Sequence, residues 1–352
     1  MTAAVESRNM SLPDVARRER PLFVLSVWRS GSSLLYALLN QHPQIGLLYE
    51  GDLPRLHRFL GRHFQDGSWR ERWEFWNRGP SRHGIALESM PADVRDAWEA
   101  TRTVYQEVAR RKQATVWGEK TPHWYDYPLR MAAQFPDARF IFLWRETHAV
   151  LRSVAHAART ERFFRKAGFT QRILVGTENL RRACDALKAQ GRPVHEVNYE
   201  DLTKNPLECM QQICRFLQLP FEERMASLEG ADRSAIALGS HHTMVRGDKI
   251  LGKRKGKDLL SSALRAKINR YVCRWKMRSD GKWPKYPDVL PASTRPPSLL
   301  ELWGDQVFYQ ALRARDRLVE RVYAVVPIDV ARGLRSWVRQ RDARTELLPI
   351  SR

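Results

Sequence analysis

The chain has 352 residues, a hydrophobic content of 43% and a formal net charge of +21 at pH 7. The hydrophobic content is sufficient for one large core, and no apolar run approaches the length that spans a bilayer. Residues 1–20 lack the apolar core of a signal peptide, so we expect a polar leader and a cytoplasmic location. The four cysteines show neither metal-site nor disulfide spacing, which fits a reducing compartment.

The positive charge is unevenly distributed. Residues 241–300 contain 15 Lys and Arg against four Asp and Glu. A positive field of this kind attracts nucleic acids, anionic lipids or small polyanionic ligands. Composition alone does not choose among these three classes of partner.

The first structural unit predicted lies at residues 21–43. Phe23 to Val27 is a short apolar run typical of a strand buried on both faces, and Leu34 to Leu39 has helical spacing. A polar turn separates them, and it predicts an anion site, because turn amides and a helix N-terminus converge there. The residues of this site are Arg29, Ser30, Gly31, Ser32, Ser33 and Leu34. The patterns of a nucleotide P-loop and of a dinucleotide fold are both absent.

Residues 44–98 contain Trp69, Trp73, Trp76 and Trp98 among Arg and His residues. This composition predicts irregular helices around a cleft, where the tryptophans either bind a sugar or belong to the core. Residues 93–112 have the periodicity of an amphipathic helix.

Further strands are predicted at 115–120, 139–144 and 194–199, with helices from Thr147, as an N-cap, and over 206–217. Strands that alternate with helices predict a doubly wound parallel sheet flanked by helices. In such sheets ligands bind at the carboxyl ends of the strands. The polar clusters lie at these ends, and they contain Arg29, Glu119, Lys120, Arg145 and Tyr199.

Strand signals are sparse beyond residue 240. Residues 259–277 and 299–341 read as basic, partly amphipathic helices separated by a Pro-rich link. The second helix either packs on the core or lies on a membrane surface. We therefore expect a leader over 1–20, a main domain over 21–255 and a helical C-terminal extension over 256–352.

Four motifs together resemble those of sulfotransferases that use 3′-phosphoadenosine-5′-phosphosulfate (PAPS). Arg29-Ser-Gly-Ser-Ser-Leu resembles the family's 5′-phosphosulfate loop, and Arg145 with Ser153 resembles its 3′-phosphate site. Gly118-Glu-Lys-Thr-Pro and Tyr199-Glu-Asp-Leu also match, in the same order. The resemblance covers about residues 20–255 and implies a P-loop-like fold, a PAPS donor, the product 3′-phosphoadenosine-5′-phosphate (PAP) and no metal.

The resemblance also implies roles for individual residues. Arg29 and the loop backbone would hold the leaving phosphate, and Lys120 would approach the leaving oxygen. Tyr199 and a basic segment near residue 250 would contact the nucleotide. The candidates in that segment are Arg246, Lys249, Lys253 and Arg254, where the family's usual motif is not present as such.

The acceptor hydroxyl requires a general base, and the resemblance to the tyrosylprotein branch implies Glu50. Asp52, His57 and His123 are rival candidates, and Glu50 could instead simply pair with an arginine. The expected acceptor is a glycan, a glycolipid or another hydroxylated metabolite. Peripheral membrane contact through the C-terminal helices and a homodimer are further expectations.

Two other functions remain as alternatives. A nucleic-acid-binding protein would use the basic 241–285 region, although zinc-finger spacing and RNA-recognition aromatics are absent. A P-loop-like kinase is disfavoured, because the Gly-Lys-Ser/Thr ending is missing.

Overall fold

A computed structural model of the protein describes most of the chain. The described residues are 20–53, 60–64, 67–76, 79–87, 94–122, 125–166, 168–236, 245–251, 259–278 and 294–344. Most of the predicted leader and the predicted site residues His57, His123, Lys253 and Arg254 lie outside them.

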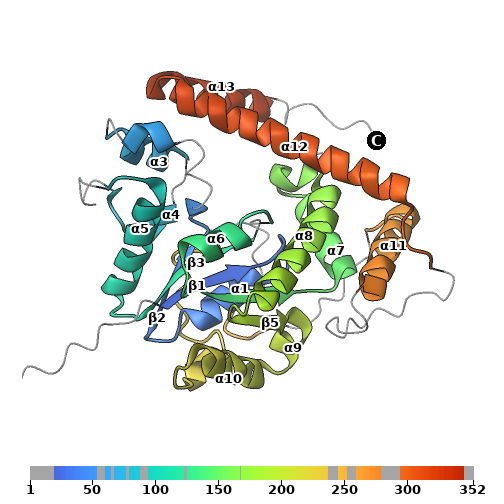
Figure 1. Ribbon diagram of the computed structural model, residues 1–352, viewed down its shortest axis with the longest axis horizontal. Helices are drawn as coiled ribbons and strands as arrows, with labels where there is room; N and C mark the ends of the chain where they lie inside the picture. The colour runs from blue at the N-terminus through green and yellow to red at the C-terminus, as the bar shows by residue number, and fades with distance from the viewer. Residues whose placement is uncertain are drawn as a thin grey trace, which may run out of the picture.

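A parallel sheet forms the centre of the molecule (Figure 1). The described strands pair in the order β2-β3-β1-β4-β5, and every neighbouring pair is parallel. The strands are β1 (Arg20–Leu25), β2 (Ile45–Tyr49), β3 (Val116–Thr121), β4 (Arg139–Trp144) and β5 (Val194–Asn198). The chain leaves the central β1 first toward one edge and later toward the other. The crevice at the carboxyl end of β1 is therefore the place where such a sheet binds ligands.

Helices cover both faces of the sheet (Figure 1). On β1, Leu22 and Val24 join one buried apolar cluster, whereas Phe23 and Leu25 join the other, as the alternation of side chains along a strand requires. The first cluster includes side chains of α1 (Ser32–Leu39), α9 (Tyr199–Lys204) and α10 (Pro206–Leu217). The second includes side chains of α5 (Ala97–Arg111), α6 (Pro128–Gln134), α7 (Thr147–Ala157) and α8 (Phe169–Ala189). The predicted doubly wound α/β architecture is confirmed.

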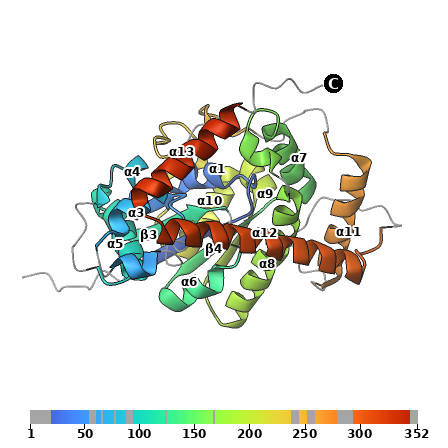
Figure 2. The ribbon, with the colours of Figure 1, turned by 90° about the horizontal axis from the view of Figure 1, so that it is seen from above.

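The C-terminal region is helical, as predicted, and it crosses one end of the molecule (Figures 1 and 2). Its described helices are α11 (Ser262–Arg278), α12 (Leu299–Val325) and α13 (Ile328–Arg344). Ion pairs tie α12 to the main domain, with Arg172 Nη2 2.7 Å from Asp316 Oδ2 and Arg313 Nη2 2.9 Å from Asp126 Oδ2.

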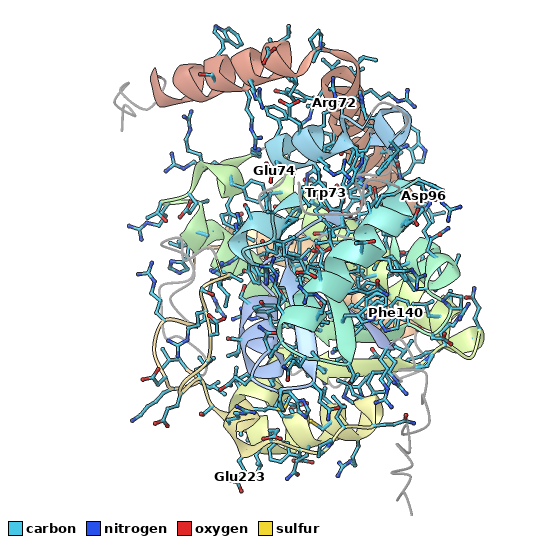
Figure 3. The ribbon with its side chains drawn as sticks, turned by 90° about the vertical axis from the view of Figure 1, so that its left-hand side faces the viewer. Arg72, Trp73, Glu74, Asp96, Phe140 and Glu223 are labelled. Atoms are coloured by element: carbon cyan, nitrogen blue, oxygen red, sulfur yellow. The ribbon has the colours of Figure 1, made fainter. Side chains whose placement is uncertain are left out.

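Two short helices lie beneath α12 and α13, and they are α3 (Trp69–Trp76) and α4 (Gly79–Arg82). Arg72 on α3 donates to the carbonyls of Tyr323 and Val326, which lie at the end of α12 (Figure 3). These bonds satisfy carbonyls that a helix end leaves without intrahelical partners. The C-terminal helices are thus anchored both on α8 and on the segment after β2.

Several local predictions were wrong. Residues 44–98 do not consist of irregular helices alone, because Ile45–Tyr49 forms β2. Its sequence, Ile-Gly-Leu-Leu-Tyr, is buried throughout and shows no alternation that would distinguish a strand from a helix. Thr147 is the first residue of α7 rather than its N-cap, which is Glu146. The predicted helix over 299–341 is two helices, because the chain leaves helical geometry at Val326, immediately before Pro327.

Gly118 in β3 has no room for a side chain. Its φ is +147°, and an added Cβ would lie 2.0 Å from the carbonyl oxygen of Leu22 on β1. We therefore expect Gly118→Ala to lower the free energy of unfolding by about 2–4 kcal/mol. Gly333→Ala is the control, because open space surrounds that helical glycine, and it should be neutral or stabilising by up to about 1 kcal/mol. Urea unfolding measures both, and equal effects of the two substitutions would contradict the steric reason given.

Candidate active site

The turn between β1 and α1 is built to receive an anion. Gly31 caps α1 with a φ of +94°, and no side chain caps the helix. An added Cβ at Gly31 would lie 2.2 Å from Cδ2 of Tyr199, so only glycine permits this approach. Ser30 is fully buried, and its Oγ has no hydrogen-bond partner among the described residues. A helix N-terminus whose N–H groups have no side-chain partner, beside a buried hydroxyl, fits a phosphate group.

Two arginines and a serine meet on one side of this turn. Arg29 Nε donates to Ser153 Oγ at 3.1 Å, and Arg145 Nη1 donates to the carbonyl oxygen of Arg29 at 2.8 Å. The Arg145 guanidinium lies 4.1 Å from the ring centre of Tyr199. Arg145 and Ser153 are eight residues apart, which is about 12 Å along a helix. In the structure Arg29 lies between them and bonds to both.

The electrostatics of this arginine cluster favour a bound anion. Burial, together with the positive charge of Arg145, lowers the pKa of Arg29 to about 10. Arg29 remains charged at neutral pH, so two like charges are held close together in a poorly solvated place. An anion with two or more negative charges would relieve this repulsion.

A buried ion pair occupies the other side of the turn. Lys120 at the end of β3 is fully buried, and its Nζ lies 2.6 Å from Oε1 of Glu50, whose side chain is 33% exposed. Burial lowers the pKa of Lys120, although the charge of Glu50 acts in the opposite direction. The carboxylate thus faces solvent, with the ammonium group beneath it.

Tyr49 connects this ion pair to the turn. The Lys120 Nζ lies 3.8 Å from the ring centre of Tyr49, and the Tyr49 hydroxyl is 2.7 Å from Ser33 Oγ in the first turn of α1. Its backbone N–H donates to Nε2 of His83 at 3.0 Å, and burial lowers the pKa of His83 to about 4, so that this ring nitrogen is free to accept. Sequence reasoning missed Tyr49 and His83, because it did not recognise β2.

Glu119, the neighbour of Lys120, holds the chain after β2 from the opposite face of the sheet. Its carboxyl group accepts hydrogen bonds from the backbone N–H of Asp52 at 2.5 Å, from Tyr105 Oη at 2.7 Å and from Thr121 Oγ1. Glu119 is fully buried, and burial raises its pKa to about 8. Glu50 and Asp52 both have positive φ values, 49° and 53°, so this turn depends on such anchoring.

Other predicted site residues lie in different surroundings. Arg246 and Lys249 are exposed, and the backbone carbonyl of Arg246 accepts from Arg233 Nη1 at 2.9 Å. Trp69 and Trp73 are each only 1% exposed and belong to the core, so they are not available to stack on a sugar. Within the described ranges, no group of His, Cys, Asp and Glu side chains could hold a metal ion. No helix in those ranges is long and apolar enough to cross a membrane.

A family model described as "Sulfotransferase family" matches residues 21–223, which is more than half of the chain. The protein therefore belongs to the sulfotransferase family, and it is a sulfotransferase with the predicted P-loop-like fold. The match ends before the C-terminal helices. A search of curated proteins finds no match.

Solved structures of sulfotransferases are similar at low identity. The sulfotransferase domain of the olefin synthase from Synechococcus PCC 7002 is 18% identical, with 82% of this chain and 94% of that chain covered and a TM-score of 0.44. Sulfotransferase STF1 from Mycobacterium tuberculosis H37Rv is 17% identical, with 59% and 69% covered and a TM-score of 0.40. Mouse SULT7A1 complexed with PAP is 13% identical, with 75% and 86% covered and a TM-score of 0.41. The family assignment rests on the family model.

The pKa of Glu119 predicts a pH-dependent stability. Because its pKa is about 8 in the folded protein and about 4.3 in an unfolded chain, the folded state binds this proton more tightly. The stability that the protonated group contributes is complete below about pH 4 and is lost as the pH rises through 8. The difference in unfolding free energy between the native protein and Glu119→Gln should therefore fall from pH 5 to pH 8, by up to about 1.4 kcal/mol per pH unit.

Urea unfolding at three pH values measures this difference. Glu107→Gln is the matched control, because a hydrogen bond from Arg110 is the main cause that lowers the pKa of Glu107 to about 2. Glu107 stays ionised between pH 5 and pH 8, so its curve should run parallel to that of the native protein. Parallel curves for Glu119→Gln as well would show that Glu119 is ionised in the folded state.

Proposed function

We propose that the protein transfers a sulfuryl group from PAPS to the hydroxyl of an acceptor and releases PAP. The observation that carries the proposal is the pair of cationic groups on the two sides of one turn. Arg29 bonds to both Arg145 and Ser153, whereas Lys120 lies beside Tyr49 and Glu50. This arrangement suits a nucleotide with anionic groups at both ends, one of which is attached to the group that reacts.

The 3′-phosphate would be held at the arginine cluster. Arg145 offers a planar guanidinium, Ser153 offers a hydroxyl, and Arg29 already bonds to that hydroxyl. One guanidinium group can bind two oxygens of a phosphate at once. An arginine therefore suits a phosphate better than a single lysine does. The ring of Tyr199 packs against the Arg145 guanidinium. Arg246, Lys253 and Arg254 are proposed to add cationic contacts to the nucleotide.

Arg29 and the backbone of the turn would hold the leaving 5′-phosphate. The residues from Ser30 to Leu34 present a helix N-terminus, and Ser30 Oγ is the buried hydroxyl without a described partner. Ser33 is kept in place by Tyr49, which also packs against Lys120. When bound, PAPS supplies the sulfuryl group. The Lys120 ammonium group would donate a hydrogen bond to the leaving-group oxygen as negative charge develops there.

Glu50 is the proposed general base. Its carboxylate is partly exposed, so that an acceptor can reach it from solvent, and its φ of 49° together with the Glu50 N–H bond to the Lys120 carbonyl at 2.9 Å fixes its backbone. The carboxylate would take the proton of the acceptor hydroxyl while the hydroxyl oxygen attacks the sulfur atom of PAPS. The bond between sulfur and the 5′-phosphate oxygen would break, and PAP would leave. Its ion pair with Lys120 holds the carboxylate in position until the acceptor arrives.

The acceptor is proposed to be a hydroxylated molecule, with glycans and glycolipids included. The alternatives of nucleic-acid binding and of a kinase are not favoured, because the family match covers the turn, the two cationic groups and Glu50 together.

Nucleotide binding is tested by titration calorimetry with PAP and with AMP. PAP should bind at least about tenfold more tightly than AMP, because only PAP has a 3′-phosphate. Arg145→Ala should lower the affinity for PAP by about tenfold or more and leave that for AMP nearly unchanged. Arg139→Ala is the matched control, because Arg139 lies at the opposite end of β4. Equal affinities for PAP and AMP in the native protein would refute the assignment of the arginine cluster.

The role of Glu50 is tested by steady-state turnover with PAPS. Glu50→Gln should lower kcat by about 10²-fold or more and change the affinity for PAP by less than about threefold, because general-base catalysis contributes about 10²–10⁴-fold. Asp52→Asn is the control, because asparagine tolerates the positive φ of that residue. Retained turnover in Glu50→Gln, with loss in Asp52→Asn, would transfer the role to Asp52.

A further inference from the structure

Helix α12 lies at the end of the molecule opposite α10 (Figure 1), and its inward face carries all of its carboxylates. Asp305 pairs with Lys267 at 2.6 Å, Asp316 pairs with Arg172 at 2.7 Å, and Glu301 pairs with Arg270 at 2.7 Å. The fourth carboxylate, Glu320, is 2% exposed. The negative charges of the helix are therefore directed at the protein.

The outward face of α12 is an apolar stripe. The exposed apolar residues of this stripe recur at steps of three and four along the whole helix. They are Leu300, Trp303, Val307, Ala311, Ala314, Leu318, Val322 and Val325. The exposed fractions of Leu300 and Trp303 are 76% and 66%, and that of Leu318 is 63%. At 1.5 Å per residue the stripe is about 37 Å long, far more than isolated surface hydrophobics produce.

Arginines accompany the stripe. Arg317 and Arg321 are exposed, and no carboxylate among the described residues pairs with them. Arg315, also exposed, shares Asp316 with Arg172. The outward half of α12 thus combines apolar and cationic side chains, while three of its four carboxylates pair with basic groups of the protein and the fourth is buried. Helix α13 adds exposed Val330, Leu334 and Trp337 at the same end of the molecule.

We propose that this outward face of α12 binds an anionic lipid surface. A helix with one apolar face and flanking arginines lies in the membrane interface, with its apolar side chains among the acyl chains and its guanidinium groups at the lipid phosphates. The separation of charge favours lipid over a second copy of the chain. A second copy of the same face would bring further arginines and only carboxylates that are already paired or buried, whereas anionic lipids supply free negative charge.

Vesicle sedimentation with the full chain tests the proposal. Binding to vesicles that contain one quarter phosphatidylglycerol in phosphatidylcholine should exceed binding to pure phosphatidylcholine by at least about tenfold, and it should weaken as salt is raised. Arg317→Gln with Arg321→Gln should lower the partition coefficient by about 25-fold, which is about fivefold for each basic residue near an anionic surface. Trp303→Ser with Leu318→Ser should lower it independently through loss of the apolar contact.

Helices α9 and α10 provide matched controls at the opposite end of the molecule (Figure 1). Lys204→Gln with Arg215→Gln removes the same charge, and Leu207→Ser removes an apolar side chain that is 50% exposed. These variants should bind vesicles within about twofold of the native protein, and all variants should keep their circular dichroism spectra and their turnover in the absence of vesicles. Equal binding to both kinds of vesicle, or an equal loss in the controls, would overturn the proposal. So would a dimer, seen by sedimentation velocity, that Trp303→Ser with Leu318→Ser dissociates.

Discussion

The site depends on the way in which two adjacent side chains of β3 hold the turn after β2. Successive residues of a strand point to opposite faces of the sheet, so Glu119 and Lys120 reach this turn from different sides. Both side chains are fully buried, and a buried polar or charged group without a hydrogen-bond partner is costly. Glu119 finds its partner in the backbone of Asp52 and Lys120 finds it in the carboxylate of Glu50. Because both groups must find partners in this turn, the turn has little conformational freedom. The position of Glu50 is fixed as a result.

The turn after β1 is held by a different balance. The close approach of Gly31 to Tyr199 brings the start of α9, directly after β5, against the turn, and Tyr199 also faces the Arg145 guanidinium. The Ser153 hydroxyl, the backbone carbonyl of Arg29 and the ring of Tyr199 hold the two arginines together against their mutual repulsion. In the proposed function, a bound phosphate offsets the repulsion between the two guanidinium groups. This gain is available only to an anion, so the site selects for one.

Helix α12 carries its negative charges and the positive charges of Arg317 and Arg321 on different faces. The carboxylates of α12 meet basic groups of α8 and α11, which stabilises its docking. The arginines and large apolar residues that remain face outward. The charge of +21 therefore has at least two structural components, one around the nucleotide site and one on this outer face.

The sequence by itself determined the parallel α/β class, the turn after β1 and the order of the four motifs, because these are encoded in short segments with local signals. It did not reveal β2, whose five residues are buried on both faces and therefore carry no alternation. Without β2, the sequence could propose Glu50 only by resemblance, and it could not find Tyr49 at all.

Tertiary structure alone decided which side chains meet. Arg29 lies 124 residues from Ser153, and Lys120 lies 70 residues from Glu50, so no local pattern could have paired them. The parallel order of the strands brings their carboxyl ends to one edge, and the burial of that edge forces each charged group to find a partner there. The same holds for α12, whose amphipathic pattern was readable in the sequence. Only its docking showed that the carboxylates and Arg313 lie inward, whereas Arg317 and Arg321 lie outward.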